Sequence, residues 1–92
     1  MKIEQLDDGK NGRFYYVENG EELAEMTYVY AGEDKIIIDH TEVHESLKGK
    51  GVGKELVKSG VEFARSKGIK IIPLCPFAKK MIELTKEWHD VL

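Results

Sequence analysis

Residues 48 to 53 read Lys-Gly-Lys-Gly-Val-Gly, which places three glycines within five positions. Glycine lets backbone N–H groups approach an anion closely, and a helix that starts at such a loop has a dipole that favours negative charge. Four lysines lie in or just after the segment: Lys48, Lys50, Lys54 and Lys58. The loop is therefore a candidate anion-binding site, and a diphosphate is the ligand that it suits.

Two common phosphate-binding loops do not describe this segment. The sequence has no Gly-x-x-x-x-Gly-Lys-Ser/Thr, and the spacing Gly49-x-Gly51-x-Gly53 does not match the dinucleotide pattern Gly-x-Gly-x-x-Gly. A chain of 92 residues is also too short for a doubly wound dinucleotide domain. The alternative interpretation is a glycine-rich turn with solvated lysines. A position between a strand and an amphipathic helix favours anion binding.

Cys75 is a candidate for nucleophilic or acid–base chemistry. It ends a predicted strand just before a helix that Pro76 opens, and the helix N-terminus with Lys79 or Lys80 would favour a thiolate. Cys75 could then accept an acyl group or donate a proton to a leaving thiolate. The alternative is a small buried residue that closes the strand.

His40 and Glu42 are candidates for a general base. They share one face of a predicted strand because side chains alternate with a period of two, so the carboxylate can orient the imidazole. The alternative is that His40 is a polar residue with its hydrogen bonds satisfied and that Glu42 is a surface charge. His44 is expected in a loop and His89 in packing near the C-terminus. One cysteine and three scattered histidines give no zinc spacing, so no metal is expected.

The first half of the chain is strand-like and the second half is rich in helix. Turn residues at 7–12 and the hairpin signal Asn19-Gly20 separate the early strands. The predicted strands cover residues 3–6, 13–18, 23–31, 35–43 and 69–75. Small or apolar residues at helical spacing predict a helix over 51–67, which Gly68 ends. A second helix begins at Pro76, with apolar residues at helical spacing as far as Trp88.

Strand 35–43, helix 51–67 and strand 69–75 form a crossover that makes the two strands parallel. With the antiparallel meander before it, this unit gives an α+β fold with a mixed, mostly antiparallel sheet, in one domain over residues 1–92. Ligands collect at the carboxyl ends of parallel strands. The glycine loop follows one of these ends, and Cys75 lies at the other.

The composition limits which partners and which cellular compartment are expected. The net charge of −3 argues against nucleic acid as a partner, although the loop lysines keep a nucleic-acid module as a third hypothesis. No apolar run has the roughly 18 residues that a membrane span needs, and the first residues lack the apolar stretch of a signal peptide. The single cysteine fits a reducing, cytoplasmic compartment. Nothing requires more than a monomer or a weak dimer through a sheet edge.

The segment Val43 to Leu56 resembles the acetyl-CoA motif of GNAT-type N-acetyltransferases, Arg/Gln-x-x-Gly-x-Gly/Ala, with Lys48, Gly51 and Gly53 on the pattern. Together with 40–43 and 73–77, it resembles a subfamily of very short GNAT-like proteins, over roughly Tyr15 to the end of the chain. Lys48 replaces the usual Arg or Gln. The N-terminal helices that shape the acceptor site in larger members have no counterpart here.

The resemblance implies a minimal GNAT fold that binds acetyl-CoA and transfers its acetyl group to a small-molecule or peptide amine. The amides of 48–53 would bind the pyrophosphate, the strand end at Glu42 and Val43 would pair with the pantetheine arm, and the strand ending at Cys75 would diverge to admit the thioester. The implied cofactor-binding residues are Val43, Lys48, Gly49, Lys50, Gly51, Val52, Gly53, Lys54, Pro76, Phe77 and Lys79, and the candidate catalytic residues are Cys75, His40 and Glu42. The alternative is a non-catalytic CoA-binding or partner-docking module.

Overall fold

The computed structural model describes residues 1–92 and contains one five-stranded sheet in the order β1-β2-β3-β4-β5. The elements are β1 (Glu4–Asp7), β2 (Asn11–Glu18), β3 (Glu21–Tyr30), β4 (Lys35–Val43), the 3-10 turn η1 (Glu45–Leu47), α1 (Val52–Lys67), β5 (Lys70–Pro73), α2 (Pro76–Glu83) and the 3-10 turn η2 (Lys86–Val91). Strands β1 to β4 are antiparallel, and β5 runs parallel to β4. The predicted mixed sheet and crossover are confirmed.

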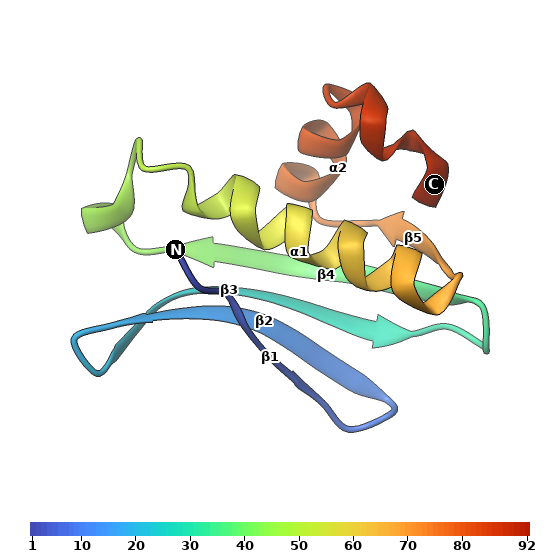
Figure 1. Ribbon diagram of the computed structural model, residues 1–92, viewed down its shortest axis with the longest axis horizontal. Coiled ribbons are helices and arrows are strands. Elements are labelled where there is room, and N and C mark those ends of the chain that lie inside the picture. Colours follow the sequence, from blue (N-terminus) through green and yellow to red (C-terminus); the bar gives the residue numbers. More distant parts are fainter.

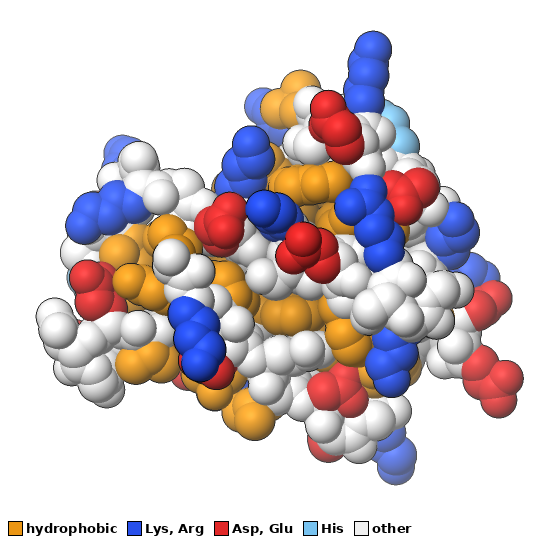
Figure 2. Space-filling view, in the orientation of Figure 1, with side chains coloured by type: hydrophobic (Ala, Val, Ile, Leu, Met, Phe, Trp, Pro, Cys, Tyr) orange, Lys and Arg blue, Asp and Glu red, His pale blue; other side chains and the backbone are white.

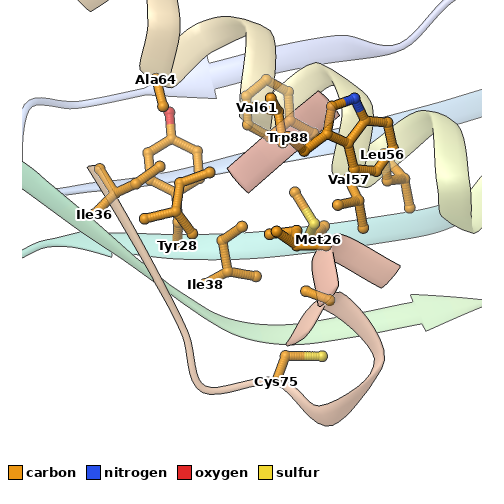
Figure 3. Close-up of a cluster of buried hydrophobic side chains, with 14 of the residues drawn as sticks. Met26, Tyr28, Ile36, Ile38, Leu56, Val57, Val61, Ala64, Cys75 and Trp88 are labelled. Carbon is orange, nitrogen blue, oxygen red and sulfur yellow. The ribbon is translucent and has the colours of Figure 1, made fainter. Parts of the chain in front are cut away.

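Both helices lie on one side of the sheet (Figure 1). The face of α1 that contacts the sheet is made of small and apolar residues, and Gly60 lets it approach so closely that a Cβ there would lie 3.0 Å from Cε of Met26. Figure 3 shows Val57, Val61 and Ala64 of α1 above Met26, Tyr28 and Ile38 of the sheet. All nineteen buried apolar residues belong to this one cluster. No helix of the fold has the length and apolar character needed to cross a membrane.

The hairpin between β2 and β3 forms as predicted, because Asn19 and Gly20 both adopt positive φ, 53° and 77°. The predicted turn at 7–12 is too long: β1 reaches Asp7 and β2 already begins at Asn11. Gly12 lies within the strand rather than the turn. A Cβ at Gly12 would stand 2.2 Å from Cζ of Tyr28, so glycine is needed there to make room for the buried ring.

Two further boundaries differ from those expected. Strand β5 covers only 70–73 instead of 69–75, because the amides of Leu74 and Cys75 both donate to the carbonyl of Ile38 and end the ladder. Helix α2 stops at Glu83. The next residues turn back, and Trp88 is buried from η2 instead of from a continuous helix.

The other face of the sheet carries no helix. Strand β4 switches faces within its length, because a register shift places Thr27 opposite His40 but Tyr28 opposite Ile38. Before the shift Ile36 and Ile38 point into the core. After it, Thr41 pairs with the buried Met26 on the helix side. His40 and Glu42 are therefore turned to the open face.

Candidate functional site

The glycine loop is anchored before it reaches α1. His44 lies in the loop after β4, as expected, and its Nδ1 accepts a hydrogen bond of 3.1 Å from the amide of Ser46. Leu47 is buried and fixes η1 against the core. Gly49 and Gly51 then adopt left-handed backbone conformations, with φ of 79° and 76°, which other residues adopt only with strain. Gly51 is the N-cap of α1.

The loop exposes a set of backbone donors. Five amides donate to no backbone carbonyl, and they belong to Gly49, Gly51, Val52, Gly53 and Lys54. By contrast, the amides of Lys48 and Lys50 are used inside the loop, where they donate to the carbonyls of Glu45 and Leu47. The donors available to an anion are thus the amides of 49 and 51–54 rather than the whole run 48–53.

A groove of about 270 Å³ opens beside this loop. Eight of the predicted cofactor-binding residues line it: Val43, Lys48, Gly49, Gly51, Val52, Gly53, Lys54 and Phe77. Leu47 and Met81 complete the lining, whereas Lys50, Pro76 and Lys79 lie outside it. The groove therefore joins the end of β4, the start of α1 and the first turns of α2.

The wall between α1 and α2 depends on a missing side chain. A Cβ at Gly53 would stand 2.5 Å from Cζ of Phe77, so only glycine lets the Phe77 ring lie against the first turn of α1. Phe77 keeps 41% of its surface exposed and presents an apolar side to the groove. This arrangement gives one apolar wall next to a polar, amide-rich end.

The charge at the loop is positive and uncompensated. Lys48, Lys50, Lys54 and Lys58 are exposed, and none forms an ion pair with a carboxylate of the chain. Figure 2 shows Lys and Arg side chains at the end of the molecule that carries the loop. Free amides, a helix N-terminus and free lysines together suit a diphosphate in charge and in hydrogen bonding.

Strands β4 and β5 diverge at the expected place. Their last pair is Ile38 with Pro73, while β4 continues to Val43. The edge of β4 from Asp39 to Val43 therefore has a strand partner only on the β3 side. The gap that opens lies between this edge and the segment that leads into α2.

Cys75 lies in that gap. It is 6% exposed, stands at the N-cap of α2, and its thiol donates a hydrogen bond of 3.3 Å to Oγ1 of Thr41. The thiol is thus a proton donor in this arrangement. Thr41 was not among the predicted residues, and its position facing Cys75 follows from the register shift in β4.

His40 and Glu42 form the predicted pair, with 3.3 Å between Nε2 of His40 and Oε2 of Glu42. Both side chains are well exposed on the open face of the sheet. Cys75 lies on the helix side, against Thr41. The three candidate catalytic residues therefore do not form one cluster. Cys75 lies on the helix side of the sheet, and His40 lies on the open face with the carboxylate of Glu42 beside its imidazole.

Two further residues of the groove were missed from the sequence. Met81 follows Phe77 by four residues, which is one helical turn, so this spacing could have indicated that both face the groove. Leu47 is the only large apolar residue between Val43 and Val52, and that isolation could have marked it as an anchor. His89, which was expected to pack, is exposed, and its Nε2 lies 2.9 Å from the carbonyl oxygen of Ile82.

The sheet order, the crossover and the loop are those of the GNAT fold. A GCN5-like protein from Staphylococcus aureus, solved by NMR, superimposes with a TM-score of 0.77 at 42% identity, covering 98% of this chain and 85% of that one. The ribosomal-protein-S18-alanine N-acetyltransferase of Escherichia coli shares the fold with a TM-score of 0.69 at 13% identity, over 85% of this chain and 53% of that one. An aminoglycoside 6'-N-acetyltransferase complexed with coenzyme A shares the fold with a TM-score of 0.63 at 16% identity, over 72% of this chain and 38% of that one.

Sequence comparison agrees with the fold. Residues 13–91 match the family model described as GCN5-related N-acetyl-transferase. Protein NATD1 of Xenopus tropicalis is 29% identical over 77 residues, which cover 83% of this chain and 71% of that protein. Protein NATD1 of Gallus gallus is 29% identical over 82 residues, covering 88% and 74%. The chain belongs to the GCN5-related N-acetyltransferase family.

Proposed function

We propose that this protein binds acetyl-CoA in the groove beside the glycine loop and transfers the acetyl group to an amine. The observation that carries the proposal is the continuity of the groove. It begins at the free amides of 49 and 51–54 and runs along Val43 and Phe77. Thr41 precedes Val43 by two residues, and Cys75 precedes Phe77 by two residues. The side chains of Thr41 and Cys75 meet in the gap between β4 and the start of α2.

Each part of the groove then has a binding role. The free amides and Lys48 or Lys54 hold the pyrophosphate, because they combine donors with positive charge at a helix N-terminus. The unpartnered edge of β4 near Val43 offers backbone groups to the amides of the pantetheine arm. Phe77 and Met81 cover the apolar part of that arm. A structural neighbour was solved with coenzyme A, which supports this assignment.

Acetyl-CoA, when bound, supplies an activated thioester, and the protein must manage two protons. His40 takes the first, from the attacking amine. If Nε2–H donates to Glu42, Nδ1 keeps the lone pair that accepts a proton. Cys75 gives the second to the departing thiolate, because its thiol is a donor buried in the gap. Acid and base then act from opposite sides of the sheet, His40 on the attacking amine and Cys75 on the leaving thiolate.

Calorimetric titration with acetyl-CoA tests the binding step. Gly51→Glu puts a negative side chain at the loop, and Gly20→Glu is its matched control, because both glycines have nearly the same positive φ, +76° and +77°, and a Cβ added at either would have no neighbour within 4 Å. We expect a micromolar dissociation constant, about −8 kcal/mol, lost in Gly51→Glu and kept in Gly20→Glu. Equal loss in both variants, or no binding to the folded wild type, would contradict the proposal. Binding without turnover in a broad amine screen would favour the non-catalytic alternative.

A further inference from the structure

The largest hollow of the molecule lies on the sheet face that carries no helix. It has a volume of about 460 Å³, and it shares no residue with the groove beside the glycine loop. Its lining comes from β1, β2, β3, β4 and the first turn of the chain. Leu6 and Val29 give it apolar surface, and Arg13 and Thr27 lie between Leu6 and β4. A hollow of this size is in the range that small organic molecules occupy, roughly 300–1,000 Å³.

Negative charge dominates the rim of this hollow. Two carboxylates line it, those of Asp8 and Asp39, and neither forms an ion pair within the chain. Asp7 also lines the hollow, but its carboxylate is turned to the helix side, where it accepts hydrogen bonds from the hydroxyls of Tyr28 and Tyr30. The one cation of the lining, Arg13, is already neutralised: its Nη1 lies 2.7 Å from Oε1 of Glu22. The hollow thus combines a hydrocarbon surface with free negative charges.

One of these carboxylates is held in the charged form by the backbone. Hydrogen bonds from the amides of Asn11 and Lys10 lower the pKa of Asp8.

Asp39, the second carboxylate, connects the hollow to the gap between the strands. Asp39 directly follows Ile38, the last residue of β4 that pairs with β5, and directly precedes His40. Its Oδ1 accepts a hydrogen bond of 2.6 Å from the Thr27 hydroxyl, which holds the carboxylate on the open face beside His40. A molecule in the hollow therefore has one end next to the imidazole and to the opening of the gap.

We propose that this hollow is the acceptor site, and that the acceptor is a small aliphatic polyamine. The inference rests on the proposed acetyltransferase function. Methylene groups contact Leu6 and Val29, while Asp8 and Asp39 bind the ammonium groups that are not acetylated. The amine nearest β4 loses its proton to His40, its nitrogen forms a bond to the acetyl carbonyl carbon, and the carbon–sulfur bond breaks. The thiolate that leaves takes a proton from Cys75.

Spermidine is the probe, and binding is measured first without acetyl-CoA. Two-dimensional NMR of the folded protein should show spermidine shifting the amides of Arg13, Thr27, Val29 and Asp39 at submillimolar concentration. Asp39→Asn keeps an acceptor for the Thr27 hydroxyl and removes only the charge, so binding should weaken roughly tenfold. Leu6→Lys adds a cation to the hollow and should weaken binding at least as much. Glu62→Gln and Leu84→Lys make the same changes at exposed positions of α1 and beyond α2, and both should bind as the wild type does.

The outcomes separate this inference from the proposed function. Spermidine that binds and is acetylated, with both steps sensitive to Asp39→Asn, supports it. Acetyl-CoA binding with spermidine shifts outside the hollow, or with equal binding in all four variants, overturns the polyamine site and leaves the proposed function standing. Acetylation of a lysine peptide but not of spermidine overturns it in favour of a macromolecular acceptor. Spermidine binding in the hollow without any acetyl-CoA binding overturns the proposed function and, with it, the acceptor role.

Discussion

The thiol of Cys75 donates a hydrogen bond of 3.3 Å to Oγ1 of Thr41, and this contact joins the residue before α2 to the strand edge that β5 has left. The contact lies in the gap where the two parallel strands part. The two side chains lie two residues before Val43 and Phe77, which line the groove.

Removal of the Cys75 thiol should affect the chemical step more than binding. We expect Cys75→Ala to lower kcat by about 100-fold or more, as loss of a general acid does, with acetyl-CoA affinity nearly unchanged. Thr41→Val, which keeps the shape but removes the hydroxyl, should have a smaller effect. Steady-state kinetics with calorimetry measures both. A wild-type kcat in Cys75→Ala would rule out the proton-donor role, and an acetylated Cys75 found by mass spectrometry would indicate the two-step route instead.

His40 should act on the acceptor side alone. Replacement by Gln is expected to lower kcat by about 100-fold or more, because the base that removes the amine proton is lost. Glu42→Gln keeps a hydrogen-bond acceptor for the imidazole and should be milder. Affinity for acetyl-CoA should be unchanged in both, since neither residue lines the groove. Loss of acetyl-CoA binding in His40→Gln would show that the residue serves the cofactor rather than the acceptor.

Gly12 should not tolerate even a methyl group. A Cβ there would lie 2.2 Å from Cζ of Tyr28, whose ring is 1% exposed and packs against Phe14 and Phe63. Gly12→Ala should destabilise the fold by about 1–3 kcal/mol, the usual cost of overpacking, as measured by urea unfolding. In the background of Tyr28→Leu the same substitution should cost much less. Additive effects of the two changes would mean that the clash is relieved elsewhere.

Asp7 should contribute to the dependence of stability on pH. Burial disfavours its charge, but hydrogen bonds from Tyr28 and Tyr30 bring its pKa below the ordinary value of 3.8. A carboxyl whose folded-state pKa is depressed stabilises the protein above the unfolded pKa, and this stability is lost as the pH falls through the folded pKa. Asp7→Asn should therefore lower the urea midpoint near neutral pH and flatten its decline between about pH 5 and pH 2. The same acid decline in Asp7→Asn and wild type would contradict this. Glu33→Gln, in the exposed turn before β4, is the control.

Much of the fold could be predicted because local signals decide it. Asn19-Gly20 is a strong local hairpin signal, because both residues adopt the positive φ that a two-residue turn needs. The apolar face of α1 shows in its spacing. The backbone donors of the glycine loop could be predicted for the same reason, since they come from consecutive residues. It could not be predicted that the amides of Lys48 and Lys50 donate to carbonyls within the loop, because these partners depend on the tight turn that η1 makes.

The arrangement of the catalytic candidates could not be predicted. Counting by twos from the buried Ile36 and Ile38 would place His40 and Glu42 on the helix side. The register shift against β3 reverses this, and the Thr27–Asp39 hydrogen bond accompanies it. Such a bulge depends on how two strands match, so the sequence of β4 alone carries no signal for it. The same shift turns Thr41 toward Cys75, which is why that contact was also missed.

The open edge of β4 has a consequence for how the protein is handled and stored. The backbone groups of Asp39–Val43 that have no strand partner on this edge can pair with any other extended chain. Acetyl-CoA bound along this edge would cap it, so the cofactor would also act as a guard against strand-to-strand aggregation. Preparations without acetyl-CoA should then lose soluble protein faster with rising concentration than preparations that contain it.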